Sequence, residues 1–158
     1  IDLPPGTGDI SLTVAQSLAL AGAVLVCTPQ QVAIDDCVRA AHMFEQLGIE
    51  ILEVVENMST FIADDVTPPR EYDIFGKGGA EKMAKRLGFP FLGAIPLTIS
   101  LRVNSDSGDP SANFDQKRDR QGSSPLATAL EAIAANVESQ ASLAAVRQGT
   151  ARPMLKIS

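Results

Sequence analysis

The first residues of the chain combine side chains that could act on a phosphate and its metal ion. An apolar stub at residues 1–3 is typical of the end of a strand, and residues 2–6 read DLPPG. In a nucleotide-binding sheet, ligands bind at the carboxyl ends of the strands. There the Asp2 carboxylate suits Mg²⁺, directly or through water, and Gly6 lets a backbone N–H approach a phosphate. A plain Pro-Gly turn after a strand is the alternative interpretation.

A second glycine-rich stretch, GKGG at residues 76–79, imitates a phosphate-binding loop. It has no Gly-Lys-Ser/Thr ending and does not follow a predicted strand. We therefore predict that this stretch is a loop leading into a helix and not a phosphate site.

Thiol and imidazole groups form no recognisable catalytic or metal motif. Cys27 lies in a strand-like run and Cys37 in a helical pattern, and their spacing is not C-x-x-C. We predict two buried, reduced thiols, with a ligand to a bridging metal or cluster as the alternative. His42 is interpreted as a packed or surface imidazole. Asp64 and Asp65 suggest a solvated loop tip, with a hard-cation site as the alternative.

The composition restricts the class of protein. The chain has 158 residues, of which 45% are hydrophobic and 20% charged, a balance typical of one globular core. A net charge of −6 argues against a nucleic-acid partner, which usually requires a basic face. No apolar run reaches the roughly 20 residues of a membrane span, and we expect no signal peptide. We expect a cytoplasmic protein, and sequence upstream of Ile1, which is not an initiator Met.

The elements that must position these residues follow an alternating pattern. Strands are predicted at residues 1–3, 23–28, 49–55 and 91–95. Helices are predicted at residues 12–21, 34–47 and 79–87, and a last helix starts with Ser124 as N-cap and Pro125 as N1. This alternation predicts an α/β fold with a doubly wound, mostly parallel sheet.

Local signals set the expected limits of these helices. Glycines 22, 48 and 88 are predicted to stop the first three helices. Asp35 and Asp36 are expected in the first turn of the helix at 34–47, where the helix dipole favours negative charge. Two segments, 59–79 and 105–124, are expected to be irregular, and residues 146–158 to be an extended or disordered tail after a domain part at 1–145.

Five motifs occur in an order that resembles the Mrp/ApbC branch of the ParA/MinD-like P-loop ATPases. They are residues 1–16, TPQ with VA at residues 28–33, VENMS at 55–59, FGKGG at 75–79 and GAIPL at 93–97. The resemblance covers about residues 1–110. It implies the C-terminal part of a P-loop NTPase domain that binds ATP and Mg²⁺ at a homodimer interface, with phosphoryl transfer to water as the reaction.

The resemblance also implies roles for single residues. Asp2 corresponds to the switch II aspartate near Mg²⁺, acting through a water, and Gly6 faces the γ-phosphate. Asn57, at the end of the third strand, would hydrogen-bond the adenine edge, and Pro96 and Leu97 would pack near the base. A local cap after a strand is the alternative interpretation of Asn57.

Two departures from the family pattern matter. No Lys-Gly-Gly-x-Gly-Lys-[Ser/Thr] loop is present, so the chain alone is not expected to hydrolyse ATP. Residues 60–69, TFIADDVTPP, lack the C-P-x-C pair that supplies thiolates to a [4Fe–4S] cluster in most members, which puts the cluster in doubt.

The expected function is assistance in iron–sulfur cluster assembly or transfer, with iron–sulfur client proteins as partners. The alternatives are a ParA/MinD-like nucleotide switch that regulates or positions a partner without a cluster, and a nucleotide-free interaction module.

Overall fold

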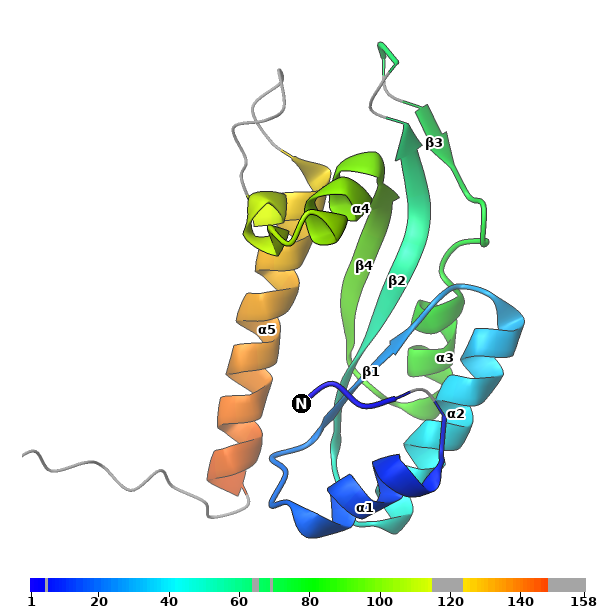
Figure 1. Cartoon of the computed structure of the whole chain (residues 1–158). Coiled ribbons are helices and arrows are strands. Elements are labelled where there is room, and N and C mark those ends of the chain that lie inside the picture. Colours follow the sequence, from blue (N-terminus) through cyan, green and yellow to red (C-terminus); the bar gives the residue numbers. More distant parts are fainter. Residues whose placement is uncertain (5, 64–65, 69, 115–123, 148–158) are drawn as a thin grey trace, which may run out of the picture.

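The computed structural model of the chain describes residues 1–4, 6–63, 66–68, 70–114 and 124–147 (Figure 1). Its elements in chain order are α1 (Asp9–Ser17), β1 (Ala23–Cys27), α2 (Gln31–Gln46), β2 (Ile51–Ala63), β3 (Arg70–Tyr72), α3 (Gly79–Leu87), β4 (Phe91–Thr98), α4 (Ile99–Asp106), the 3-10 helix η1 (Pro110–Phe114) and α5 (Pro125–Arg147).

The four strands form one mixed sheet around β2. Strand β1 pairs with the first half of β2 in parallel, and β4 pairs with β2 in parallel from Val54 to Ile62. Because the β1 and β4 pairings overlap along β2, these two strands lie on its opposite edges. Strand β3 pairs antiparallel with the end of β2, from Phe61 to Ala63. The predicted α/β fold with a mostly parallel sheet is confirmed.

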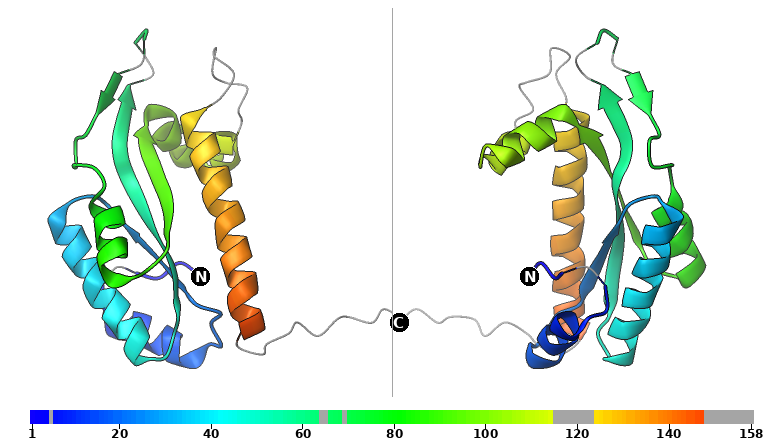
Figure 2. Two further views of the ribbon diagram at one scale, coloured as in Figure 1. Left: turned by 180° about the vertical axis from the view of Figure 1, so that it is seen from behind. Right: turned by 45° about the vertical axis from the view of Figure 1, so that its right-hand side comes forward.

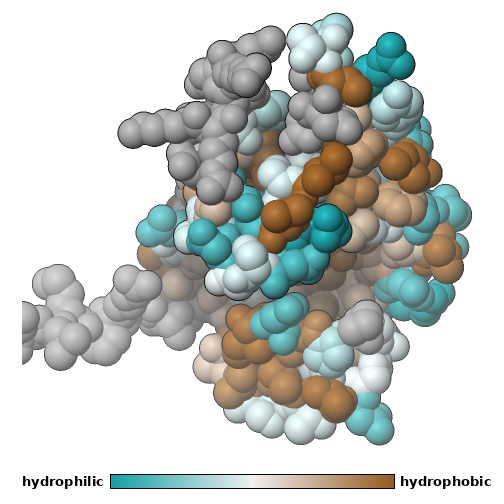
Figure 3. Space-filling view, turned by 45° about the horizontal axis from the view of Figure 1, so that its top comes forward, coloured by the Kyte–Doolittle hydropathy of each residue, from teal (hydrophilic) through white to brown (hydrophobic). Residues whose placement is uncertain are grey.

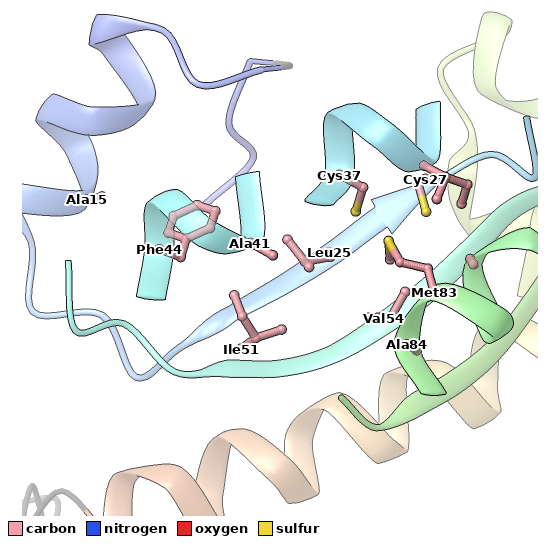
Figure 4. Packing of buried hydrophobic residues seen from close by; sticks show 12 residues of the cluster. Ala15, Leu25, Cys27, Cys37, Ala41, Phe44, Ile51, Val54, Met83 and Ala84 are labelled. Carbon is pink, nitrogen blue, oxygen red and sulfur yellow. The ribbon is translucent and has the colours of Figure 1, made fainter. Parts of the chain in front are cut away.

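Helices cover both faces of this sheet. Helices α2 and α3 pack on β1 and β2, and α5 packs along β4 and β2 from the opposite side (Figures 1 and 2). The main hydrophobic core lies under α2 and α3 and includes Leu25, Val54 and Met83 (Figure 4). Its small members Ala41, Ala80 and Ala84 are fully buried and let the helices approach the strands closely.

Three predicted helices are confirmed, with changes at their ends. Helix α3 matches the predicted 79–87, and Gly88 caps it in the left-handed conformation. Ser124 caps α5, because its hydroxyl accepts the Ala127 N–H at 3.3 Å. Helix α2 starts at Gln31, three residues before the prediction, so Asp35 and Asp36 lie outside its first turn.

The first predicted helix was placed too late. Helix α1 covers Asp9–Ser17, so Gly22 does not stop it. Gly22 instead lies where a Cβ would come 2.5 Å from Leu52 Cγ. The predicted strand at residues 1–3 is also wrong. This segment has no ladder partner among the described strands, and Leu3 packs against the core instead.

The prediction that residues 59–79 are irregular is wrong for the first half of this segment. Strand β2 continues to Ala63 and turns back into β3, and the rings of Phe61 and Tyr72 lie 6.3 Å apart across the pair. The segment 105–124 contains η1, while residues 115–123 lie outside the described part. Helix α5 includes Val146 and Arg147 of the expected tail, and residues 148–158 are not described.

Candidate functional site

A cavity of about 850 Å³ lies between the N-terminal segment, β1, α2 and α5. All five residues of β1 line it, and Phe44 of α2 and Val137 of α5 contribute apolar walls. The volume falls in the range of small-molecule pockets. In a space-filling view, hydrophobic residues gather below a hollow on one face of the molecule (Figure 3).

Three predicted site residues line this cavity. Asp2 and Gly6 reach it from the N-terminal segment, and Asn57 reaches it from β2. Gly6 has a φ of +85°, a backbone conformation that favours glycine, and no heavy atom lies within 4 Å of the position of a Cβ. Its backbone is therefore approachable, as a contact to a phosphate requires.

The sequence predicted that Asn57 ends its strand. In the structure Asn57 instead lies inside β2. Its partner across the pair with β4 is Ile95, and the register shifts between Asn57 and Phe61. The next residue, Met58, has a φ of +54°, and its N–H donates to Asn57 Oδ1 at 2.9 Å. The side-chain oxygen of Asn57 is thus engaged by the backbone of the next residue. The Nδ2 donors of Asn57 have no partner among the described residues.

Pro96 and Leu97 do not line the cavity. Pro96 is buried and Leu97 is half-buried within β4, where Leu97 pairs with Phe61. The reason is topological, since β4 lies on the edge of β2 opposite β1 and the cavity lies along β1. The structure therefore brings Asp2, Gly6 and Asn57 to one cavity and leaves Pro96 and Leu97 outside it.

The charge lining the cavity is acidic. Among the described residues that line it, Asp2 and Asp36 carry carboxylates and no side chain is Lys or Arg. The Asp36 carboxylate pairs with Arg39, so the Asp2 carboxylate is the one that suits a hard cation such as Mg²⁺. The phosphates of a nucleotide need positive countercharge as well, and these residues do not supply it. The lining therefore fits the metal part of a nucleotide site but needs cationic groups from elsewhere for the phosphates.

The GKGG stretch is a loop that enters α3, as predicted, and the structure shows why it is closed to a phosphate. The Glu56 carboxylate accepts the N–H groups of Gly78 and Ala80, both at 2.9 Å. Glu56 is 1% exposed. A helix N-terminus attracts an anion, and here the anion is a side chain of the protein itself. The loop also packs tightly, since a Cβ on Gly79 would lie 2.4 Å from the Pro29 carbonyl oxygen.

Sequence reasoning missed two buried carboxylates on β2. The first is Glu56, and an acidic residue within an apolar strand was the feature of the sequence that could have revealed it. Glu53 is the other: it is also 1% exposed, and its Oε2 has no hydrogen-bond partner among the described residues. Burial raises the pKa of Glu53 above its ordinary value because it disfavours the charged form.

Both cysteines are free and buried, as predicted, and both line the cavity. Hydrogen bonding between the two thiols raises the pKa of Cys27, with burial and nearby negative charge adding to the shift. The same hydrogen bond lowers the pKa of Cys37 against the opposing effect of burial. Cys27 therefore keeps its proton to higher pH than Cys37 does.

The remaining candidates give no site. His42 is at the surface, with its Nδ1 3.3 Å from the Glu45 carboxylate. Asp64 and Asp65 lie outside the described residues. In the part of the chain that the structure describes, no three His, Cys, Asp or Glu side chains are grouped to hold a metal ion. No helix there is both long and apolar enough to cross a bilayer.

Comparison with known proteins identifies related sequences. Residues 1–138 match the ParA family model described as NUBPL iron-transfer P-loop NTPase. An iron-sulfur cluster carrier protein from Synechocystis is 47% identical over 92% of this chain and 39% of its own length. An Arabidopsis thaliana iron-sulfur protein required for NADH dehydrogenase, mitochondrial, is 46% identical over 70% of this chain and 34% of its own. The chain thus spans well under half the length of these relatives.

A solved structure shares the fold. A nucleotide-binding protein from Archaeoglobus fulgidus, in complex with ADP and with cobalt, is 38% identical and superposes with a TM-score of 0.61. The match covers 70% of this chain and 44% of that one.

Proposed function

Because the chain belongs to the ParA family of NUBPL-type iron-transfer P-loop NTPases, we propose that its protein assists the assembly or transfer of iron–sulfur clusters. The observation that carries the proposal is the cavity along β1, which collects polar residues of the DLPPG and VENMS motifs. We place the protein in the cytoplasm, acting on iron–sulfur client proteins.

The cavity is proposed as the part of an ATP site that this chain contributes. The Asp2 carboxylate would hold a water of the Mg²⁺ ion, and the Gly6 N–H would donate to the terminal phosphate. The free Nδ2 donors of Asn57 would bind acceptor nitrogens of the adenine. Bound Mg²⁺ would supply charge neutralisation during phosphoryl transfer to water, and the chain's own residues would position it.

Pro96 and Leu97 would act on the base only indirectly in this arrangement. They lie in the β4 strand that pairs with Asn57 and its neighbours, so they hold β2 in place and do not line the cavity. The cationic groups that the phosphates require would come from parts of the protein outside the cavity lining. We propose that the complete site forms in a homodimer.

The test of the nucleotide site compares two aspartates in the full-length protein. Asp2→Asn removes a charge from the cavity, and Asp9→Asn removes one from the exposed first turn of α1. We expect Asp2→Asn to weaken Mg²⁺-dependent ATP binding by at least about tenfold, or 1.4 kcal/mol, in calorimetric titration. Asp9→Asn should bind as the unchanged protein does. Equal affinity in all three proteins would reject Asp2 as the metal-side residue.

A second function, a nucleotide switch without a cluster, is favoured by one observation. Residues 60–69 contain no cysteine, so the thiolates that usually hold a cluster are missing from this stretch. The carrier function requires a bound iron–sulfur cluster, and the switch function does not. If the full-length protein gains visible absorbance and iron on anaerobic reconstitution, and passes the cluster to an apo-ferredoxin, the carrier function stands. A colourless, iron-free protein that still binds ATP would favour the switch.

A further inference from the structure

Cys27 and Cys37 bring two thiols together from different elements. Cys27 is the last residue of β1, and Cys37 lies in the second turn of α2, which follows after a short turn. The two thiols are close enough that each shifts the pKa of the other. Figure 4 shows the two sulfur atoms side by side in the space between β1 and α2.

Both thiols are buried but reachable. Each cysteine is only 7% exposed, and each lines the cavity along β1. A small solute that enters the cavity can therefore contact the pair. In this pair one cysteine keeps its proton while the other can become a thiolate. The interaction with Cys27 lowers the pKa of Cys37, which favours the thiolate there, and the thiolate is the nucleophilic form.

We propose that Cys27 and Cys37 form a redox modification site, at which hydrogen peroxide entering the cavity converts the two thiols to an intramolecular disulfide. The Cys37 thiolate attacks one peroxide oxygen, the O–O bond breaks, and the released hydroxide takes up a proton to leave as water. The Cys27 sulfur then attacks the sulfenic acid on Cys37, and the second oxygen leaves as water with the Cys27 proton. Two thiols and one peroxide thus give one disulfide and two waters.

The disulfide would change the shape of the cavity. A disulfide bond is about 2 Å long, so the two free sulfurs must move closer to form it. The start of α2 must then shift toward the end of β1. Thr28 and Asp36 are chain neighbours of the two cysteines and also line the cavity. If nucleotides bind in this cavity, which rests on the proposed function, oxidation will weaken their binding.

Peptide mapping after peroxide treatment tests the site itself. The reduced full-length protein is titrated with hydrogen peroxide, remaining thiols are alkylated, and the digest is analysed without reductant. We expect a bridged peptide that contains both cysteines and disappears on treatment with dithiothreitol. The outcome that overturns the proposal is two fully alkylated cysteines, or bridges between chains only, at peroxide concentrations that oxidise the same protein when it is unfolded.

Two variants separate the roles of the cysteines. With Cys27→Ser, Cys37 should stop at sulfenic acid, which dimedone labels. With Cys37→Ser, burial and the nearby Glu56 carboxylate still raise the pKa of Cys27, so Cys27 should react more slowly than Cys37 does in the Cys27→Ser variant. Equal rates for the two single variants, both folded by circular dichroism, would contradict the assigned nucleophile. Nucleotide affinity is measured separately, so a bridge that forms without affecting ATP binding would reject the effect on the cavity and leave the modification site standing.

Discussion

Glu56 joins β2 to the start of α3 through two hydrogen bonds to backbone N–H groups. Removing its carboxylate leaves the buried Ala80 N–H and the partly buried Gly78 N–H without this partner, and an unpaired buried group costs about 1–3 kcal/mol. We predict that Glu56→Ala lowers the free energy of unfolding by about 2–4 kcal/mol. Urea denaturation followed by circular dichroism measures this.

Glu56→Gln keeps the side-chain size and one acceptor, so its loss should be smaller, about 1–2 kcal/mol. Glu71→Gln, on exposed β3, is the matched control, and its effect should stay within about 0.5 kcal/mol. If Glu56→Ala is no more destabilising than the Glu71 control, the carboxylate does not hold the helix.

Glu53 has the opposite character, because its buried carboxylate lacks a full set of partners. Its pKa is raised in the folded state, so the protonated form is favoured there. The contribution of such a group is complete below the unfolded pKa of a glutamate and is lost as the pH rises through the folded pKa. The wild-type chain therefore loses stability from this group on going from mildly acidic to alkaline pH.

We predict that Glu53→Gln removes this pH dependence. The variant should be more stable than the wild-type chain at pH 8, by about 1–3 kcal/mol, and the advantage should shrink as the pH falls below the ordinary pKa of glutamate. Urea midpoints across that pH range provide the measurement. A constant difference between the two proteins at all pH values would show that Glu53 keeps its charge on folding.

At the level of single residues, the three proposed site residues that line the cavity were suggested by local sequence. Asp2 and Gly6 belong to one short motif, and Asn57 follows an apolar run, so their approach to β1 follows from a parallel sheet. The exclusion of Pro96 and Leu97 depends on which edge of β2 receives β4. Strand order is a property of the whole sheet, and no local pattern in GAIPL encodes it.

The start of α3 packs tightly against the turn between β1 and α2, and a substitution can test this contact between the two elements. A Cβ on Gly79 would lie 2.4 Å from the Pro29 carbonyl oxygen, closer than real Cβ atoms come to backbone oxygen. We predict that Gly79→Ala destabilises the chain by about 1–3 kcal/mol through overpacking.

Gly8→Ala is the matched control for Gly79→Ala. Gly8 lies at a helix start as the N-cap of α1, as Gly79 does as the first residue of α3, but no heavy atom lies within 4 Å of the position of the Gly8 Cβ. Its substitution should change the unfolding midpoint little. Thermal unfolding of the two variants and the wild-type chain makes the comparison, and equal midpoints for all three would mean that the loop can move away from Pro29.

The elements that the sequence predicted best are those with signals at both ends. Helix α3 has a glycine before it and Gly88 after it, and its bounds were predicted correctly. The extension of β2 was missed because Phe61 and Ile62 are held by pairing with β3 and β4, which are distant in sequence. Helix α4 was missed although Thr98 caps it by accepting the Leu101 N–H. Polar residues inside α4 hid its periodicity.

At the scale of the whole molecule, the sheet is open along one side of β1. Strand β1 pairs with β2 alone among the described strands, and Val26, the next-to-last residue of β1, is 58% exposed. Unpaired strand edges recruit other strands, and exposed apolar side chains strengthen that tendency.

We predict that this 158-residue chain, produced by itself, associates with itself through the β1 edge. Val26→Lys places a charge on that edge, which is the usual protection of exposed strands, and should raise the dissociation constant by at least about tenfold, or 1.4 kcal/mol. Val32→Lys is the control, because Val32 is 67% exposed but lies on α2 and not on the sheet. Light scattering after size-exclusion chromatography, over a concentration series, measures the change. A wild-type chain that stays monomeric at the highest concentration, or a Val32→Lys variant that dissociates as readily as Val26→Lys, would show that the open edge is not the contact.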